Sequence, residues 1–149
     1  MLWVTRPKPH VDRCASAWLI KRFIDKEAIF EFITKEQDIP KDAIGFTLPK
    51  ASINPVEGVR TTFDALVERY EVKDPIVLRI KEVVRDYEFN EEEPARMRLK
   101  ETLGVCYVLK GLEKTSVTDA EAVEKALIVM DAFYAALKGL SDVKASAET

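Results

Sequence analysis

The sequence contains one histidine, His10, and two cysteines, Cys14 and Cys106, in 149 residues. Zinc sites that need two or more histidines are therefore excluded, as are iron sites built from two histidines and one carboxylate. The two cysteines lie far apart in the sequence and form no Cys-x-x-Cys pair, which is typical of a reduced intracellular protein. We expect a cytoplasmic protein.

Glycine is also scarce, with five residues, and none of them forms part of a phosphate-binding motif. The patterns GxxxxGK[ST], GxGxxG and GxSxG do not occur, which excludes the standard P-loop, dinucleotide-binding and α/β-hydrolase classes. No apolar run reaches the ~20 residues of a membrane span. The polar N-terminal segment also differs from a signal peptide. The sequence therefore predicts a globular protein with no membrane partner.

The formal net charge is −3, from 23 basic and 26 acidic residues. Domains that bind nucleic acid by themselves usually have a pI above ~9, so nucleic acid is not an expected partner. The charge is unevenly distributed, because residues 1–26 carry a net +4 and the remainder a net −7. Positive charge is thus concentrated where the fold begins.

The N-terminal third of the chain has the pattern of a small sheet. Leu2–Thr5 is apolar and β-prone, and the prolines that follow it force an extended exit. From Val11 the apolar residues follow a helical period. In residues 29–34 apolar and polar residues alternate, which is typical of a strand. Strand, helix and strand in this order predict a short parallel βαβ unit. Residues 44–48 form a plausible third strand.

Four further helices are predicted. They cover residues 63–70 with Thr62 as cap, a segment beginning at Asp74-Pro75, a segment that follows Asn90 or Glu93 and reaches about Lys110 with Gly111 as stop, and a segment from Thr118 to about Gly139. Thr118 and Glu121 have the spacing of a capping box. We therefore predict an α+β fold, with a small sheet covered by about five helices. It forms a single domain at 2–140, followed by a flexible tail at 141–149.

The segment between the first strand and the first helix is the main candidate site. A helix N-terminus with unpaired N–H groups attracts anions, and guanidinium forks suit a tetrahedral oxyanion. The candidate anion-binding residues are Arg6, Lys8, His10, Arg13 and Arg22, supported by Asp12, Trp18 and Asp25. The competing interpretation is a solvated basic face, because Arg13 and Arg22 lie on opposite sides of the helix. In that interpretation Trp18 belongs to the core and Asp25 to a helix end.

An acidic run offers a weaker candidate, a hard-cation site with Asp86 and Glu88 as ligands. Helix-end capping and solvation explain such a run equally well. The sequence identifies no other cofactor, and the protein could function without one.

Residues 3–30, WVTRPKPHVDRCASAWLIKRFIDKEAIF, resemble the opening of the chromate-resistance domain, the C-terminal domain of ChrB-type proteins. Further fragments fit the same pattern: Gly58 with Thr62-Phe63-Asp64, Asp74-Pro75, and residues 130–134. The resemblance covers about residues 2–137. It implies a role in chromate resistance. Longer members look like chromate-responsive regulators with a separate N-terminal domain, so we expect a stand-alone sensing or accessory domain here.

The chain departs from the family pattern at three positions. Val56, Thr61 and Arg85 stand where the pattern has a histidine, a cysteine and a second histidine. Those three residues would make a credible soft-metal or redox site, and this chain lacks all of them. The basic segment after the first strand is intact.

Three functions remain open. The first is binding or sensing of a small oxyanion, chromate- or sulfate-like, at the basic turn. The second is an enzyme for a small anionic substrate, with acid–base groups or a divalent metal on Asp12, Asp86 and Glu88. The third is a protein-interaction or self-association module, for which a homodimer is a possible form.

Overall fold

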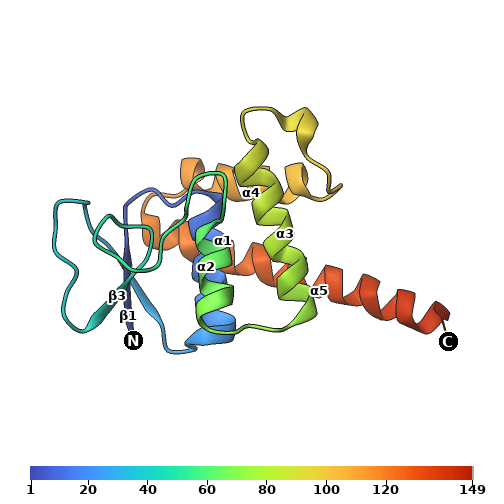
Figure 1. Cartoon of the computed structure of the whole chain (residues 1–149), viewed down its shortest axis with the longest axis horizontal. Helices are drawn as coiled ribbons and strands as arrows, with labels where there is room; N and C mark the ends of the chain where they lie inside the picture. Colours follow the sequence, from blue (N-terminus) through green and yellow to red (C-terminus); the bar gives the residue numbers. More distant parts are fainter. Residues whose placement is uncertain (149) are drawn as a thin grey trace.

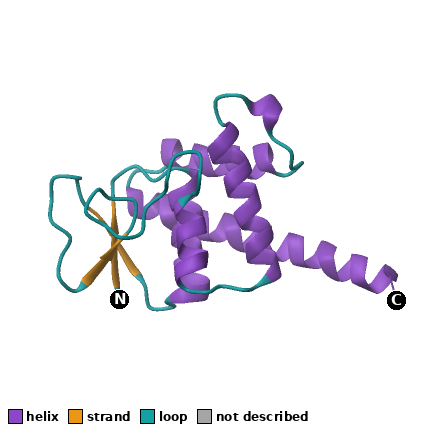
Figure 2. Cartoon of the chain, in the orientation of Figure 1, coloured by secondary structure: helices purple, strands orange, loops and turns teal. Residues whose placement is uncertain are grey.

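A three-stranded parallel sheet lies at one end of the molecule, and helices make up the rest (Figures 1 and 2). The computed structural model describes residues 1–148. The strands are β1 (Leu2–Thr5), β2 (Ile29–Phe32) and β3 (Ala43–Gly45), in the order β2-β1-β3. Trp3 of β1 pairs with Phe30 on one side and with Ile44 on the other. The parallel pairing of β1 with β2 confirms the predicted βαβ unit, and the α+β class is confirmed.

Residues 1–148 form five α-helices, in agreement with the predicted number. They are α1 (Val11–Leu19), α2 (Thr62–Arg69), α3 (Pro75–Asn90), α4 (Thr102–Thr115) and α5 (Asp119–Glu148). A π-helical turn, η1 (Ile20–Ile24), continues α1, and a 3₁₀ turn, η2 (Pro94–Arg96), precedes α4.

Helix α1 is the centre of the helical layer. Its apolar positions Val11, Cys14, Ala15 and Trp18 are all at most 1% exposed. It contacts α2, α3, α4 and α5. Burial of each large side chain in such a core contributes roughly 1.5–3 kcal/mol. The helix is therefore held in place from all sides, and its N-terminal end is fixed relative to the neighbouring helices.

The predicted boundaries of two helices are wrong. Helix α2 is capped by Thr61 rather than Thr62: Thr61 Oγ1 accepts from Asp64 N, and Asp64 Oδ2 accepts from Thr61 N at 2.8 Å. The third predicted helix starts at Thr102 instead of directly after Asn90 or Glu93, and Gly111 lies inside it. Since Gly costs only about 1 kcal/mol in a helix, tertiary packing overrides it as a stop signal.

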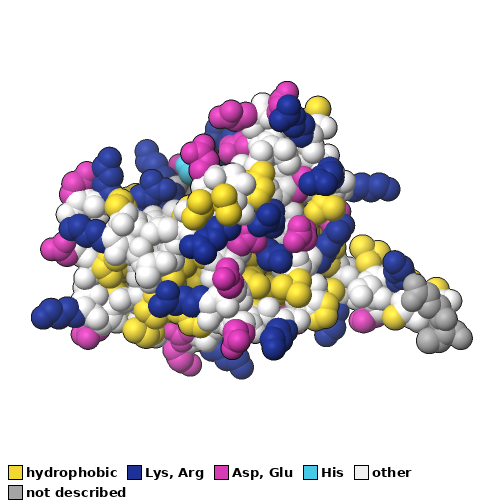
Figure 3. Space-filling model, viewed as in Figure 1, with side chains coloured by type: hydrophobic (Ala, Val, Ile, Leu, Met, Phe, Trp, Pro, Cys, Tyr) yellow, Lys and Arg dark blue, Asp and Glu magenta, His cyan; other side chains and the backbone are white. Residues whose placement is uncertain are grey.

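The last helix extends further than expected. It runs to Glu148, past the predicted end at Gly139, so residues 141–148 of the expected tail are helical and Thr149 lies outside the described residues. Its first half buries Val123, Ala126 and Met130, whereas its second half projects from the body (Figures 1 and 3). The flexibility of the tail and the domain limit at residue 140 stay predictions.

The viewed surface mixes charges of both signs, with dark blue and magenta side chains interspersed (Figure 3). Of the helices in residues 1–148, none has the length and apolarity needed to cross a membrane.

Candidate functional site

The order of the strands indicates where a ligand would bind. The chain goes from β1 through α1 to β2 on one side of β1, and then crosses to β3 on the other side. Ligands of open parallel sheets bind outside the carboxyl ends of the strands, where the connections diverge in this way. Here that position lies between β1 and β3.

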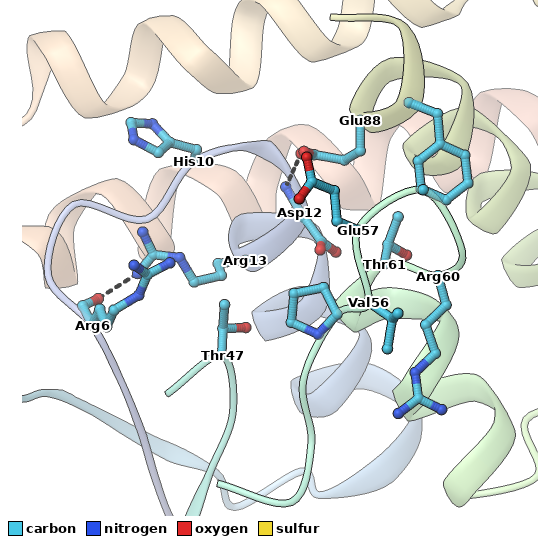
Figure 4. A pocket seen from close by; sticks show the side chains of 13 residues that line it. Arg6, His10, Asp12, Arg13, Thr47, Val56, Glu57, Arg60, Thr61 and Glu88 are labelled. Atoms are coloured by element: carbon cyan, nitrogen blue, oxygen red, sulfur yellow. Dashed lines mark hydrogen bonds between the residues drawn. The ribbon is translucent and has the colours of Figure 1, made fainter. Parts of the chain in front are cut away.

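A cavity of about 270 Å³ opens at this position (Figure 4). Segments that follow β1 and β3 line it, together with the C-terminal part of α3. The residues used below are Arg6, His10, Asp12, Arg13, Thr47 and Glu88, and the loop at 55–61 forms one wall. The cavity has room for a tetrahedral oxyanion with several waters.

The backbone beside the cavity is strained at two positions. Lys8 has φ of 56° and Thr47 has φ of 54°, although neither is glycine. Such a conformation is rare for a β-branched residue like Thr47 and persists where surrounding contacts impose it. Thr47 Oγ1 lies 2.8 Å from Thr62 Oγ1, and Lys8 N donates to Asp119 Oδ1 at 3.1 Å. Strained residues of this kind are common at functional sites, which supports the assignment of the cavity as the functional site.

Arg13 organises the turn after β1. Its guanidinium donates to the backbone carbonyl oxygens of Arg6, Pro7 and Lys8, the last at 2.6 Å. The residue is only 7% exposed. Burial, followed by repulsion from Arg6, lowers the pKa of Arg13 to about 10. The predicted anion ligand is therefore first of all the residue that shapes the turn, and its charge lies beside Arg6.

Arg6 is the exposed basic residue of the turn whose guanidinium can reach a ligand in the cavity. It is exposed and lines the cavity, and within residues 1–148 it forms no ion pair. Figure 4 shows its side chain beside that of Arg13. An anion in the cavity would meet two neighbouring guanidinium groups, one of them free to bind.

Asp12 and Glu88 supply carboxyl groups to the same cavity. Asp12 N donates to Glu88 Oε1 at 3.2 Å, so a carboxylate from α3 caps α1. The Asp12 carboxylate in turn accepts from Thr62 N at 2.7 Å and from Phe63 N at 3.0 Å, at the start of α2. An N–H group of α1 that we expected to be open for an anion is thus already bonded to Glu88.

The environment perturbs both carboxyl groups. Burial raises the pKa of Asp12 to about 6, against the hydrogen bonds from Thr62 and Phe63 that lower it. Burial, together with the nearby charge of Asp12, raises the pKa of Glu88 to about 7. Groups that titrate near neutral pH in a cavity are candidates for proton binding or transfer.

His10 and Lys8 lie at the margin of the cavity. The His10 side chain is 60% exposed, with Nδ1 3.6 Å from Glu113 Oε2, and Figure 4 shows it pointing away from Glu88. Lys8 lines an adjoining shallow hollow with Arg6 and residues 34–36. Neither side chain is directed at the carboxyl pair.

Arg22, Trp18 and Asp25 are not part of this cavity. Arg22 binds Asp131 through two hydrogen bonds of 2.9 Å, and Trp18 Nε1 donates to the same carboxylate at 2.9 Å. Asp25 accepts from Trp3 Nε1 and binds the N-terminal amine. These contacts tie α1 and η1 to α5 and β1, which is a structural role.

The structure also separates Asp86 from Glu88. Asp86 accepts hydrogen bonds from Arg98 N, Leu99 N and Thr102 Oγ1, and it lines a different hollow. Burial opposes these bonds, but the net effect is to lower the pKa of Asp86. Residues two apart on a helix do not face each other. Within the described part of the chain, no group of three or more His, Cys, Asp or Glu could hold a metal ion.

The sequence did not indicate the wall formed by residues 55–61. Two of the three positions that depart from the family pattern, Val56 and Thr61, line the cavity. The third, Arg85, binds Asp64 at 2.7 Å and stacks over Phe89, itself a lining residue. The departures from the family pattern at Val56, Thr61 and Arg85 could therefore have indicated this wall of the cavity from the sequence.

The fold and the site together define a small α+β domain with a cavity at the carboxyl edge of a parallel sheet, lined by guanidinium and carboxyl groups. The family model of the ChrB C-terminal domain matches residues 3–137, and the chain belongs to this family. The resemblance to the chromate-resistance domain is thereby confirmed.

A curated relative, Protein ChrB of Cupriavidus metallidurans (strain CH34), is 29% identical over 133 residues. The match covers 89% of this chain and 39% of that protein, so the chain spans about two fifths of the relative's length. No solved structure matches the chain.

Proposed function

We propose that this domain binds a small tetrahedral oxyanion of the chromate type in the cavity between β1 and β3, as a cytoplasmic component of chromate resistance. Membership of the ChrB C-terminal domain family supports the link to chromate. The binding site is inferred mainly from the position of Arg6. This residue lines the cavity, has no ion-pair partner in residues 1–148, and belongs to the turn that Arg13 holds through backbone hydrogen bonds.

The role of each group follows from its contacts. Arg6 binds the anion through its planar fork. Arg13 fixes the backbone of residues 6–8 through three hydrogen bonds and adds a second positive charge beside Arg6. Lys8, His10 and Arg22 contribute no direct ligand.

Calorimetric titration with potassium chromate, phosphate and sulfate tests the proposal. Arg6→Ala removes a charge-assisted hydrogen-bond donor worth roughly 1.5–3 kcal/mol, which corresponds to an affinity loss of about 10- to 150-fold. Arg96→Ala is the matched control, because Arg96 is 71% exposed and pairs with Glu93 away from the cavity. Absence of binding with all three anions, or equal losses in both variants, contradicts the proposal.

The Asp12–Glu88 contact favours one second candidate, an enzyme that acts on a small anionic substrate. Glu88, with a pKa of about 7, would serve as the general acid or base while Arg6 holds the substrate. Turnover of an anionic substrate that stops in Glu88→Gln but persists in Glu82→Gln would support it. Self-association stays a prediction, with light scattering as its measurement.

A further inference from the structure

Glu88 lies in the cavity with one carboxyl oxygen occupied and one free. Oε1 accepts the hydrogen bond from Asp12 N at 3.2 Å. No donor within residues 1–148 binds Oε2. Asp12 differs, because both of its oxygens accept backbone hydrogen bonds from α2. Of these two carboxyl groups, Glu88 is therefore the one with an oxygen, Oε2, that has capacity for a ligand.

Charged and titratable groups surround Glu88 on several elements. Arg6 and His10 of the turn, Asp12 and Arg13 of α1, and Glu57 and Arg60 of the loop at 55–61 line the same cavity. Glu91, which directly follows α3, and Cys106 on α4 also interact with it electrostatically. Figure 4 shows Arg60 pointing away from Glu88, whereas Arg6 and Arg13 lie on the opposite side of the cavity.

Because Arg6 and Glu88 line the same cavity, an oxyanion that lies between them would meet a guanidinium group on one side and a carboxyl group on the other. An ionised carboxylate only accepts hydrogen bonds, and a fully deprotonated oxyanion also only accepts. Their contact is favourable only when one proton lies between them. That proton can arrive on the anion, as in hydrogen phosphate or hydrogen chromate, or it can be taken from solvent by Glu88.

We propose that the cavity binds an oxyanion together with one proton, shared between Glu88 Oε2 and an oxygen of the anion. This inference rests on the proposed function and defines its ligand class as hydrogen oxyanions. The proton balance is simple. Hydrogen phosphate and hydrogen chromate bring the proton with them, whereas sulfate and fully ionised chromate bind only with uptake of one proton from solvent.

The pH dependence of affinity separates these cases. Because the pKa of Glu88 is about 7, the protonated fraction falls above that pH. Sulfate and chromate are then expected to bind about tenfold more weakly for each pH unit. Phosphate brings its own proton over the same range, so its affinity is expected not to fall as the pH rises.

Calorimetry on the full chain between about pH 6 and pH 8.5, at constant ionic strength, measures these affinities. Buffers of different ionisation enthalpy report the protons taken up, with about one expected for sulfate at the alkaline end and none for phosphate. In Glu88→Gln the amide can donate to a deprotonated anion, so sulfate affinity is expected to lose its pH dependence. Glu82→Gln, on the same helix outside the cavity, is expected to keep it.

The outcomes separate the two proposals. Oxyanion binding with the same pH dependence for sulfate and phosphate, or with unchanged dependence in Glu88→Gln, overturns the shared proton but leaves the proposed function standing. Absence of binding with every anion overturns both. The wild-type proton uptake decides the question even if Glu88→Gln does not fold.

Discussion

Glu88 of α3 accepts a hydrogen bond from the backbone N–H of Asp12 in α1, so carboxyl groups from two helices meet on one side of the cavity. Each of them caps a helix other than its own, since Asp12 binds the start of α2. The pair joins three helices at the edge where β1 and β3 end. The same contacts that hold the site together also make its stability depend on proton binding.

The first prediction concerns stability and pH. Burial raises the pKa of Asp12 to about 6 and that of Glu88 to about 7, above the value of about 4 in an unfolded chain. Between these values the folded protein binds more protons, so the free energy of unfolding decreases as the pH rises. We expect a decrease of about 2–4 kcal/mol between about pH 5 and pH 8, measured by urea unfolding.

Glu88→Gln is expected to remove about two thirds of this decrease, whereas Glu82→Gln on the same helix is expected to leave it unchanged. A stability that stays constant or increases over this range contradicts the prediction. Asp131, whose pKa is lowered by its hydrogen bond with Arg22, has the opposite effect, but only at more acidic pH.

The second prediction concerns the anchoring role of Asp12. Asp12→Ala leaves the N–H groups of Thr62 and Phe63 without their acceptor. Loss of an acceptor for partly buried donors costs roughly 1–3 kcal/mol each, and we expect a total loss of about 2–6 kcal/mol by urea unfolding. Ser16→Ala removes only a 3.4 Å contact to the same carboxylate and is expected to cost less than about 1 kcal/mol. Equal effects of the two substitutions would refute the anchoring role.

The secondary structure could be predicted where its signals are local. The two prolines after Thr5 and the apolar period from Val11 place the end of β1 and the start of α1. Asp74 caps α3 through Ile76 N and Val77 N, two and three residues away. Such signals act within one helical turn, so the sequence reveals them directly.

The site was less predictable because its contacts join distant segments. Asp12 caps a helix 50 residues away, and Glu88 bonds α1 from 76 residues away. The start of α4 was missed for a related reason, since Asp86 accepts hydrogen bonds from Arg98 N and Thr102 Oγ1 and so helps to set where α4 begins. Periodicity and capping rules contain no information about such partners.

The third prediction uses the strained conformation of Lys8. At φ of 56° a glycine avoids the clash of Cβ with the backbone. Lys8→Gly is expected to stabilise the protein by up to about 1 kcal/mol, measured as a higher midpoint of urea unfolding. Lys8→Ala is the matched control, because it removes the same side chain but keeps Cβ, and no gain is expected. A loss of stability in Lys8→Gly, or the same change in both variants, contradicts a strained turn.

The fourth prediction separates Arg22 from the anion site. Its ion pair with Asp131 is exposed, with side-chain exposures of 40% and 46%, and such pairs contribute only ~0–1 kcal/mol. Arg22→Ala is therefore expected to lower the free energy of unfolding by less than about 1 kcal/mol and to change oxyanion affinity by less than about twofold. Asp131→Ala also removes the acceptor of Trp18 Nε1, whose residue is 1% exposed, and is expected to cost about 1–3 kcal/mol. From its position outside the cavity, Arg22 can attract an anion only over a long distance, and salt screens such attraction. An affinity loss in Arg22→Ala as large as that in Arg6→Ala would therefore show that Arg22 belongs to the site.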